Sequence, residues 1–389
     1  MLGSKDSSIL RSDNKGSVPV CGKKWAPMSQ PQPELDQLRQ QVARLDREIL
    51  EKISERLQTS RLIGEAKRRA QLPIRDFRVE ASVMERARQA ARELGFDPAL
   101  AESVLESLIE AAVQTQVAHQ PVTHKGEHQR ILIAGGSGRM GAWLRQFLEG
   151  QGHTVASCDP HGGQFADLSA ANGQPWDVVV LSTPLAILPE TLGQALQLPG
   201  KPLIFDIGSL KTHLVAPLQA AAAQGHRVAS LHPMFAPGTV VLTGRSVLVC
   251  DAGDAKATEQ ACDLFRETAV SLCPVPLEQH DQVMGGLLGL SHTVNLLFGQ
   301  ALGQLGLSFE RLGPIASTTF AKQAKTAAEV AAENPELYHQ IQYLNQCTPQ
   351  VYAALQASLE RMRLAALAPE AEPFLELMGE CRRYFFPAS

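Results

Sequence analysis

The chain has 389 residues, with 36 lysines and arginines against 40 aspartates and glutamates, and a formal charge of −4. That length predicts two or three domains, and a hydrophobic content of 44% is enough for packed cores, which excludes wholesale disorder. The mild acidity and the 5% aromatic content argue against a nucleic-acid-binding protein. No uncharged apolar run approaches about 18 residues, which argues against a membrane-spanning helix. The seven cysteines are scattered and never spaced CxxC, which predicts reduced thiols in a cytosolic protein with no structural metal site.

The first third of the chain changes from a polar segment to a long helical pattern. Residues 1–33 are polar, broken by Gly and Pro and aperiodic, so we expect a disordered N-terminal tail that is not a secretory signal. Over residues 34–69, apolar side chains recur near the 3.6-residue period, which predicts one long helix closed by Pro73. A helix of that length spans more than about 50 Å. It cannot bury its apolar stripe in so small a unit, so we expect it to pack against a second copy of itself.

Two shorter helices are expected next. The pattern predicts a second helix over residues 79–94, ended by Gly95. Asp97 then caps a third helix that has Pro98 at its first position. The first 90 or so ordered residues are therefore expected to form three helices.

After a polar linker, the pattern becomes one of short β-branched runs that alternate with helix-like stretches. This alternation predicts a parallel, doubly wound α/β sheet. The runs lie at residues 131–135, 154–159, 177–182, 202–207, 227–232 and 246–251.

From about Leu277 the strand signals stop and the remaining chain is rich in Ala, Leu and Gln, which predicts a third, helical domain. The expected boundaries are a tail at 1–33, an all-α domain at 34–116, a linker at 117–127, a Rossmann dinucleotide-binding domain at 128–276 and a helical dimerisation and substrate domain at 277–389.

A glycine-rich segment follows the first predicted strand and opens a predicted helix. Its GxGxxG pattern permits a tight turn and lets backbone N–H groups approach a pyrophosphate at the helix N-terminus. The next predicted strand ends in a carboxylate that can accept hydrogen bonds from ribose hydroxyls and repel a 2′-phosphate, which favours NAD over NADP. The alternatives are an ordinary glycine-rich turn and a solvated aspartate. The predicted cofactor-binding residues are Gly136, Ser137, Gly138, Arg139, Met140, Gly141 and Asp159.

Two cations lie on the apolar stripe of the long helix. Arg56 and Lys67 are eleven residues apart, which places them within about 20° on one helical face. Buried cations need partners, so these two either meet carboxylates in a dimer seam or line a pocket for an anion. Arg39 lies at the edge of the stripe, within reach of a partner chain, and Gln116 places an amide on the interior face of the third helix.

The segments LRQQVARLDREIL, ERL, IGEAK, LPIRD and VE resemble the all-α chorismate mutases. They precede a Rossmann segment that contains DIGSLK and LHPMFAPGT. Over residues 34–389, the combination resembles the bifunctional chorismate mutase–prephenate dehydrogenases of tyrosine biosynthesis. The resemblance implies a three-helix mutase domain, an α/β Rossmann NAD-binding domain and an all-α C-terminal dimerisation domain. It implies a cytosolic homodimer, both isomerase and oxidoreductase, that converts chorismate to prephenate and then, with NAD, to 4-hydroxyphenylpyruvate. Feedback inhibition by tyrosine is a further family expectation, and no membrane or nucleic-acid partner is expected.

The resemblance also implies roles in the mutase pocket. Arg39, reaching from the other subunit, and Arg56 would bind the two carboxylates of chorismate. Lys67 and Gln116 would donate to the ether oxygen, which gains negative charge as the C–O bond breaks. A pericyclic rearrangement needs no nucleophile, only a preorganised polar cage. The residues implied to lie near the hydroxyl are Asp76 and Glu80.

A histidine stands where the crevice of an open α/β sheet is expected. His232 follows a predicted strand at its carboxyl end, and an imidazole there can take the proton of a hydroxyl as hydride leaves. On position alone, a loop-packing histidine fits as well. The resemblance implies that His232 polarises the C4 hydroxyl of prephenate, that Ser209 orients His232 and touches the substrate, and that Lys211 assists by its charge.

The start of the helical domain resembles the family too. His292 would lie near the prephenate side chain, with a core histidine as the alternative, while His280 and Asp281 would support the domain junction. Relatives carry a carboxylate-binding arginine where this chain has Ala321, with Lys322 next to it. A lysine supplies charge without a bidentate fork, so arogenate is an alternative substrate.

The mutase half also departs from its relatives, since Val79 replaces a common Arg and Ala112 a common Ser. We expect one or two hydrogen bonds fewer in that pocket. One rival function is a prephenate or arogenate dehydrogenase whose helical N-terminal unit is only regulatory or dimerising, in which Lys67→Ala changes no activity. The other is a nonenzymatic NAD-responsive binding protein, in which His232→Asn leaves function intact.

Overall fold

A computed structural model gives the structure of residues 33–69, 77–116, 128–239, 242, 244–266, 268 and 270–387. The predicted tail, the predicted linker and Asp76 lie outside the described residues, apart from Pro33 at the end of the tail. The chain divides into two units, Met1–Arg56 and Leu57–Ser389, which are described separately. Among the described residues, the first unit is the amino-terminal part of one long helix.

The N-terminal region is helical, as predicted. The turn after its second helix uses Gly95 at a φ of +79°, a conformation that favours glycine. The Asp97 carboxylate then accepts a hydrogen bond from the Ala99 N–H at 2.9 Å, which caps the third helix. Buried Met84 and Ile109 pack the second and third helices together. The helices are α1 (Pro33–Arg69), α2 (Phe77–Leu94) and α3 (Pro98–Gln116).

The central region is a seven-stranded sheet with the order β2-β1-β3-β4-β5-β6-β7. The first five strands in this order are parallel, whereas β6 runs antiparallel to β5 and β7 runs parallel to β6. The strands are β1 (Arg130–Ala134), β2 (Thr154–Cys158), β3 (Val178–Leu181), β4 (Leu203–Asp206), β5 (Val228–Pro233), β6 (Ser246–Cys250) and β7 (Ser271–Pro274).

Two predictions about the sheet were wrong. The sheet is mostly, not wholly, parallel, because residues 234–245 join β5 to β6 and contain Pro237 and Gly238, which disfavour the crossover helix that a parallel connection needs. The prediction also missed β7. That strand is only four residues long, lies at the edge of the sheet and has no buried residue, so its sequence lacks the apolar run of a central strand.

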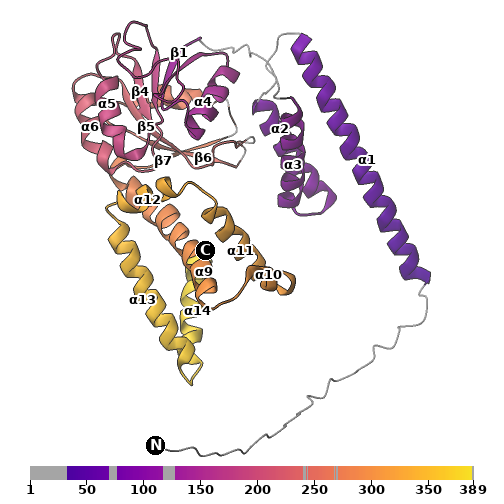
Figure 1. Ribbon diagram of the computed structural model, residues 1–389. Coiled ribbons are helices and arrows are strands. Elements are labelled where there is room, and N and C mark those ends of the chain that lie inside the picture. The colour runs from indigo at the N-terminus through magenta and orange to yellow at the C-terminus, as the bar shows by residue number, and fades with distance from the viewer. Residues whose placement is uncertain are drawn as a thin grey trace, which may run out of the picture. The chain divides into compact units, whose positions relative to one another are not determined.

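Alternate residues of the strands supply two apolar layers. Ile131 and Ile133 face one layer with α4 and α7, while Leu132 and Ala134 face the other with α5 and α6. Figure 1 shows α5 and α6 together to the left of the strands and α4 to their right. The helices of this region are α4 (Arg139–Gly150), η1 (Leu185–Ile187), α5 (Leu188–Ala195), α6 (Thr212–Ala223) and α7 (Ala255–Arg266).

The remaining chain is helical and joins the sheet directly, since Leu277, Met284 and Ile341 belong to the same buried cluster as α5 and α6. A π-helical turn, η3, connects α8 to α9 without a break. Among the described residues, no helix is long and apolar enough to cross a membrane. The helices are η2 (Leu277–Gln279), α8 (His280–Met284), η3 (Gly285–Leu290), α9 (Ser291–Gln304), α10 (Phe309–Leu312), η4 (Gly313–Ile315), α11 (Thr318–Ala331), α12 (Pro335–Tyr343), α13 (Thr348–Leu367) and α14 (Glu372–Phe385).

Candidate functional site

The glycine turn between β1 and α4 has the shape that its sequence predicts. Gly135 has a φ of +82°, and a Cβ on Gly136 or Gly141 would overlap the side chain of Ser157 or the carbonyl of Gly135, respectively. Gly138 is different, because a Cβ there would come no closer than 3.3 Å to another atom, the Gly135 oxygen. The protein's own packing therefore requires Gly136 and Gly141, while a Cβ at the exposed Gly138 would make one tight contact, with the Gly135 oxygen. The first-turn N–H groups of α4 lack intrahelical acceptors and suit an anion.

The carboxylate after β2 lies against this turn. One oxygen of Asp159 accepts a hydrogen bond from the Ser137 N–H at 3.1 Å, and the other accepts one from the His161 N–H at 2.9 Å. The two halves of the predicted dinucleotide site are thus adjacent. Binding of ribose by Asp159 stays a prediction.

Two contacts bring other parts of the chain to the glycine turn. Arg139, at the start of α4, forms an ion pair of 3.1 Å with Glu333, which precedes α12. On the inner side of α4, the Trp143 indole donates to the Thr239 carbonyl at 2.9 Å and contacts the ring of Phe235. Because Phe235 and Thr239 follow β5, the segment after His232 packs on the helix that the glycine turn begins.

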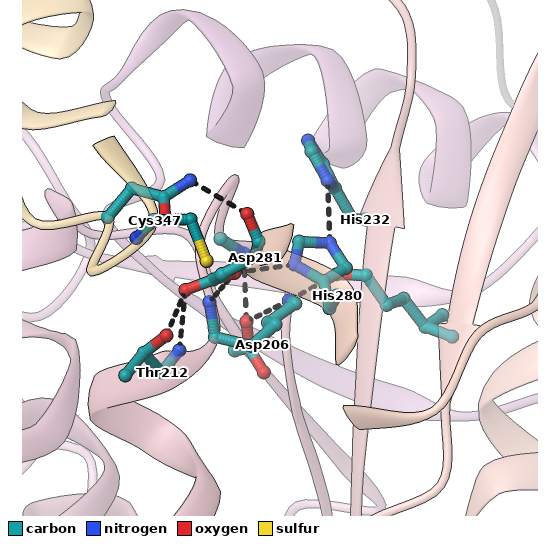
Figure 2. Close-up of polar contacts among 10 residues, drawn as sticks. Asp206, Thr212, His232, His280, Asp281 and Cys347 are labelled. Carbon is teal, nitrogen blue, oxygen red and sulfur yellow. Dashed lines mark hydrogen bonds and ion pairs between the residues drawn. The ribbon is translucent and has the colours of Figure 1, made fainter. Parts of the chain in front are cut away.

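His232 lies at the carboxyl end of β5 and is 5% exposed. Its Nδ1 atom lies 3.1 Å from Nε2 of His280, the first residue of α8. The Nδ1 atom of His280 lies in turn 2.7 Å from Oδ1 of Asp281. Figure 2 shows the three side chains as a connected series, with the second ring nitrogen of His232 directed away from His280.

The Asp281 carboxylate is held by the N-terminus of α6. Oδ1 also accepts from the Lys211 N–H at 2.7 Å, and Oδ2 accepts from the N–H and the hydroxyl of Thr212 at 2.7 and 2.6 Å. Burial raises the pKa of this carboxyl, but the hydrogen bonds from His280, Thr212 and Lys211 outweigh burial and lower the pKa to about 2. Asp281 is therefore ionised at neutral pH.

Lys211 is fully buried behind His232. Its ammonium donates to Oδ1 of Asp206 at 2.5 Å and to the carbonyl of Leu231 at 2.8 Å. It thus ties together the carboxyl ends of β4 and β5, next to the residue that precedes His232. These contacts fix the Lys211 ammonium close to His232. Substrate binding by Lys211 stays a prediction.

Both histidines of the series are neutral at pH 7. Burial holds the pKa of His232 well below its usual value, and the positive charge of Lys211 lowers it further. Burial also lowers the pKa of His280, although the hydrogen bond to Asp281 opposes this effect. Each of the two rings therefore carries a single proton, on one of its two nitrogens.

Other predicted dehydrogenase residues lie around this series. Ser209 is half-buried in the loop after β4 and makes no side-chain hydrogen bond within the described residues, whereas His280 contacts the His232 ring. Orientation of His232 by Ser209, which the family resemblance implies, stays a prediction. His292 is buried in α9, and its ring stacks on Tyr338 with centroids 4.0 Å apart. Burial lowers the pKa of His292. Lys322 is exposed on α11, the helix that packs against α9.

The sequence carries one signal for a chemical role of His280. The pair His280-Asp281 comes soon after the last strand, directly after η2, and adjacent imidazole and carboxylate groups are typical of a polar network. The sequence interpretation assigned the pair to the domain junction only. The structure adds that His280 contacts the candidate base.

The predicted mutase residues are only partly described. Arg39 is exposed and pairs with Asp36 at 3.3 Å. Arg56 is half-buried, its Nη1 atom is buried without a partner among the described residues, and burial lowers its pKa. The side chains of three further candidates on α1, α2 and α3 lie outside the described residues: Lys67, Glu80 and Gln116.

Comparison with known proteins finds two family matches. Residues 38–117 match chorismate mutase type II, and residues 163–274 match the nucleotide-binding domain of prephenate dehydrogenase. The second match begins after the glycine turn and Asp159, so the prediction that they bind a dinucleotide is supported by their geometry and not by this match.

Other known proteins are similar to most of this chain. The chain is 28% identical over 309 residues to the T-protein of Enterobacter agglomerans, covering 79% of this chain and 81% of that protein. It is 23% identical to the T-protein of Haemophilus influenzae, covering 79% and 80%. The crystal structure of prephenate dehydrogenase from A. aeolicus with hydroxyphenyl propionate and NAD⁺ covers 67% of this chain and 99% of that chain, with 18% identity and a TM-score of 0.54. That likeness shows the shared fold.

Proposed function

Because the chain carries a chorismate mutase domain and a prephenate dehydrogenase nucleotide-binding domain, it is a bifunctional chorismate mutase–prephenate dehydrogenase, and we propose how its residues divide the two reactions. The helical N-terminal domain rearranges chorismate to prephenate. The sheet and the C-terminal helices then carry out the oxidative decarboxylation of prephenate to 4-hydroxyphenylpyruvate. The observation that carries the second assignment is the buried His232, placed at the carboxyl edge of the same sheet as the glycine turn.

The glycine turn fits NAD. The exposed Gly138, which has no side chain, and the start of α4 suit a pyrophosphate, and Asp159 would accept hydrogen bonds from the adenosine ribose. The remaining residues of the turn, Ser137 and Arg139, are exposed beside it. When bound, NAD⁺ supplies the hydride acceptor.

His232 then acts on the substrate hydroxyl. Its neutral imidazole accepts the C4–O–H proton as hydride leaves C4, and the ring carboxylate leaves as CO₂. His292 and Lys322 would contact the substrate from the helical region, with Lys322 providing positive charge for a carboxylate. A lysine binds a carboxylate through charge alone, so arogenate remains the alternative substrate.

In the mutase reaction, the chain needs only a polar cage. Arg56 carries a buried guanidinium nitrogen without a partner among the described residues, and a carboxylate of chorismate would provide one. Arg39 would bind the other carboxylate from the partner subunit, Lys67 and Gln116 would donate to the ether oxygen, and Asp76 and Glu80 would lie near the hydroxyl.

We also propose that the protein acts as a homodimer in the cytosol. Large apolar side chains are exposed in one row on α1 and singly on the last two helices, and exposed apolar surface of this kind is typical of an interface. The six described cysteines that carry free thiols fit a reducing compartment. Light scattering of the purified protein tests the dimer, and a monomeric mass would contradict it. The exposed residues are Leu38, Val42, Leu45, Ile49, Leu359, Leu364, Leu375 and Met378.

The function is tested by incubating the purified protein with chorismate and NAD⁺ and following chorismate loss and NADH gain separately. We expect both. Chorismate loss without NADH, also with added prephenate, would defeat the dehydrogenase assignment, and NADH from added prephenate without chorismate loss would defeat the mutase assignment. Parallel assays with arogenate and with added tyrosine test the alternative substrate and the predicted feedback inhibition.

A further inference from the structure

We infer that His280 and Asp281 fix the tautomer of His232, so that His232 keeps its proton on Nδ1 and presents an unprotonated Nε2 to the substrate hydroxyl. The inference deepens the proposed dehydrogenase function and rests on the role given to His232 there. His280 and Asp281 are positioning residues in this scheme, since they act through His232 and do not touch the substrate.

The Asp281 carboxylate determines which nitrogen of His280 carries a proton. Oδ1 and Oδ2 of Asp281 are each within 2.7 Å of two donor positions: His280 Nδ1 and Lys211 N at Oδ1, and the N–H and hydroxyl of Thr212 at Oδ2. Backbone N–H groups can only donate, so the carboxylate serves as an acceptor throughout and carries no proton. The proton between Asp281 and His280 therefore belongs to Nδ1 of His280.

The proton on His280 determines in turn which nitrogen of His232 carries a proton. His280 is 0% exposed and buried at neutral charge, so its single ring proton is the one on Nδ1 and its Nε2 is a bare acceptor. The 3.1 Å contact then requires Nδ1 of His232 to be the donor. A neutral His232 with its proton on Nδ1 has a lone pair on Nε2, and that atom makes no hydrogen bond to the described residues.

The surrounding charges support this order. The Lys211 ammonium, although paired with Asp206, opposes a positive charge on His232. His213, at the start of α6, is held neutral because burial lowers its pKa. The ionised Asp281, at the far end of the series, favours the positive charge that develops on His232 when it accepts a proton.

The chemical step then balances. The O–H bond of the substrate breaks as an N–H bond forms at Nε2 of His232, while the hydride from C4 passes to NAD⁺. Loss of CO₂ breaks the C–C bond and leaves its electron pair in the ring as a phenolate. The same proton returns from Nε2 to that oxygen, which restores neutral His232 for the next turnover.

Three variants test the inference. His280→Leu removes the acceptor for the Nδ1 proton, so we expect kcat for prephenate to fall about 10²–10⁴-fold, the usual contribution of general acid–base catalysis. The KM for NAD⁺ and the chorismate mutase rate should stay near wild type. His280→Gln retains an oxygen acceptor and should recover at least a tenth of the wild-type kcat. His226→Leu, the same change just before the amino end of β5, should alter none of these three values.

A second measurement decides the question without relying on a variant that folds. In the wild-type protein labelled with ¹⁵N-histidine, the ring signals that disappear in His232→Asn should be those of a tautomer protonated at Nδ1. Signals of an Nε2-protonated ring, or of an equal mixture, would overturn the inference. If His232→Asn loses activity while His280→Leu keeps full kcat, this inference fails and the proposed function stands. If His232→Asn keeps full kcat, the proposed role of His232 fails as well.

Discussion

At the scale of single residues, the buried ion pair behind the site shows how charge is placed where no water reaches. Lys211 and Asp206 are 0% and 1% exposed, and the ammonium also binds the carbonyl of Leu231. Asp206 in addition accepts the Gly208 N–H at 2.9 Å. Burying both charges is unfavourable, but removing one partner is worse, since the other is then left unpaired.

Lys211→Met is therefore expected to lower the free energy of unfolding by about 3–5 kcal/mol, the usual cost of breaking a buried pair from one side. Urea unfolding followed by circular dichroism measures it. The double variant Lys211→Met with Asp206→Asn should recover part of the loss, because the amide is neutral and its oxygen can still accept from Gly208. Equal unfolding midpoints for the wild type and Lys211→Met would show that the pair contributes nothing.

At the scale of elements, the turn from β1 into α4 separates glycines that the fold needs from a glycine that leaves room for a ligand. Gly136 and Gly141 are closely surrounded by protein atoms, whereas Gly138 adopts a φ of −66° that any residue tolerates. The motif thus serves packing through Gly136 and Gly141, and the proposed role in binding falls to Gly138.

Two substitutions should separate these roles. Gly141→Ala should lower the free energy of unfolding by about 3 kcal/mol, the upper end of the cost of overpacking. Gly138→Ala should change it by no more than about 1 kcal/mol but raise the Kd for NAD⁺ about tenfold or more, as expected for a loss of about 1.4 kcal/mol. Titration calorimetry and urea unfolding measure the two effects. Gly150→Ala, at the end of α4 with no neighbour within 4 Å, is the control. An unchanged Kd in Gly138→Ala would remove the pyrophosphate from this turn.

At the scale of the whole molecule, the dehydrogenase site joins the sheet to the helices that follow it. The rings of His232 and His280 meet across this junction, and the buried cluster under it includes Leu277, Met284 and Ile341. Several histidines are buried here in their neutral form and Asp281 in its ionised form, so the free energy of unfolding depends on pH.

Stability is expected to fall as pH decreases from 7.5 to 5.5. Burial lowers the pKa of His213, His232, His280 and His292, so between the folded pKa values and about 6.5 the unfolded chain binds more protons than the folded chain. Stability rises with pH wherever that holds. Below about pH 4, protonation of Asp281, with its pKa of about 2, removes roughly 2 kcal/mol more.

Urea unfolding at pH 7.5, 6.5 and 5.5 measures this dependence. His280→Gln has one titrating ring fewer, so its free energy of unfolding should fall less steeply over the same interval. A stability that is constant or increases towards pH 5.5 would show that these histidines are not buried in their neutral form.

Much of the fold could be predicted from short segments of the sequence. Gly95, Asp97 and Pro98 predicted the turn between α2 and α3, and the glycine motif predicted the start of α4, because backbone conformation and capping depend on neighbouring residues. The position of His232 at the end of a buried strand followed from the same local pattern. The sequence by itself thus determined most of the elements, the conformation of the glycine turn and the position of the candidate base.

Only the tertiary structure decided the direction of β6 and the partner of His232. His232 and His280 are 48 positions apart, and Asp281 binds Thr212 across 69. No periodicity or spacing encodes such contacts, because they arise when α8 packs against the carboxyl ends of β4 and β5. Local residue order sets which elements form, whereas long-range packing sets which polar atoms meet, and the state of the His232 imidazole depends on the second.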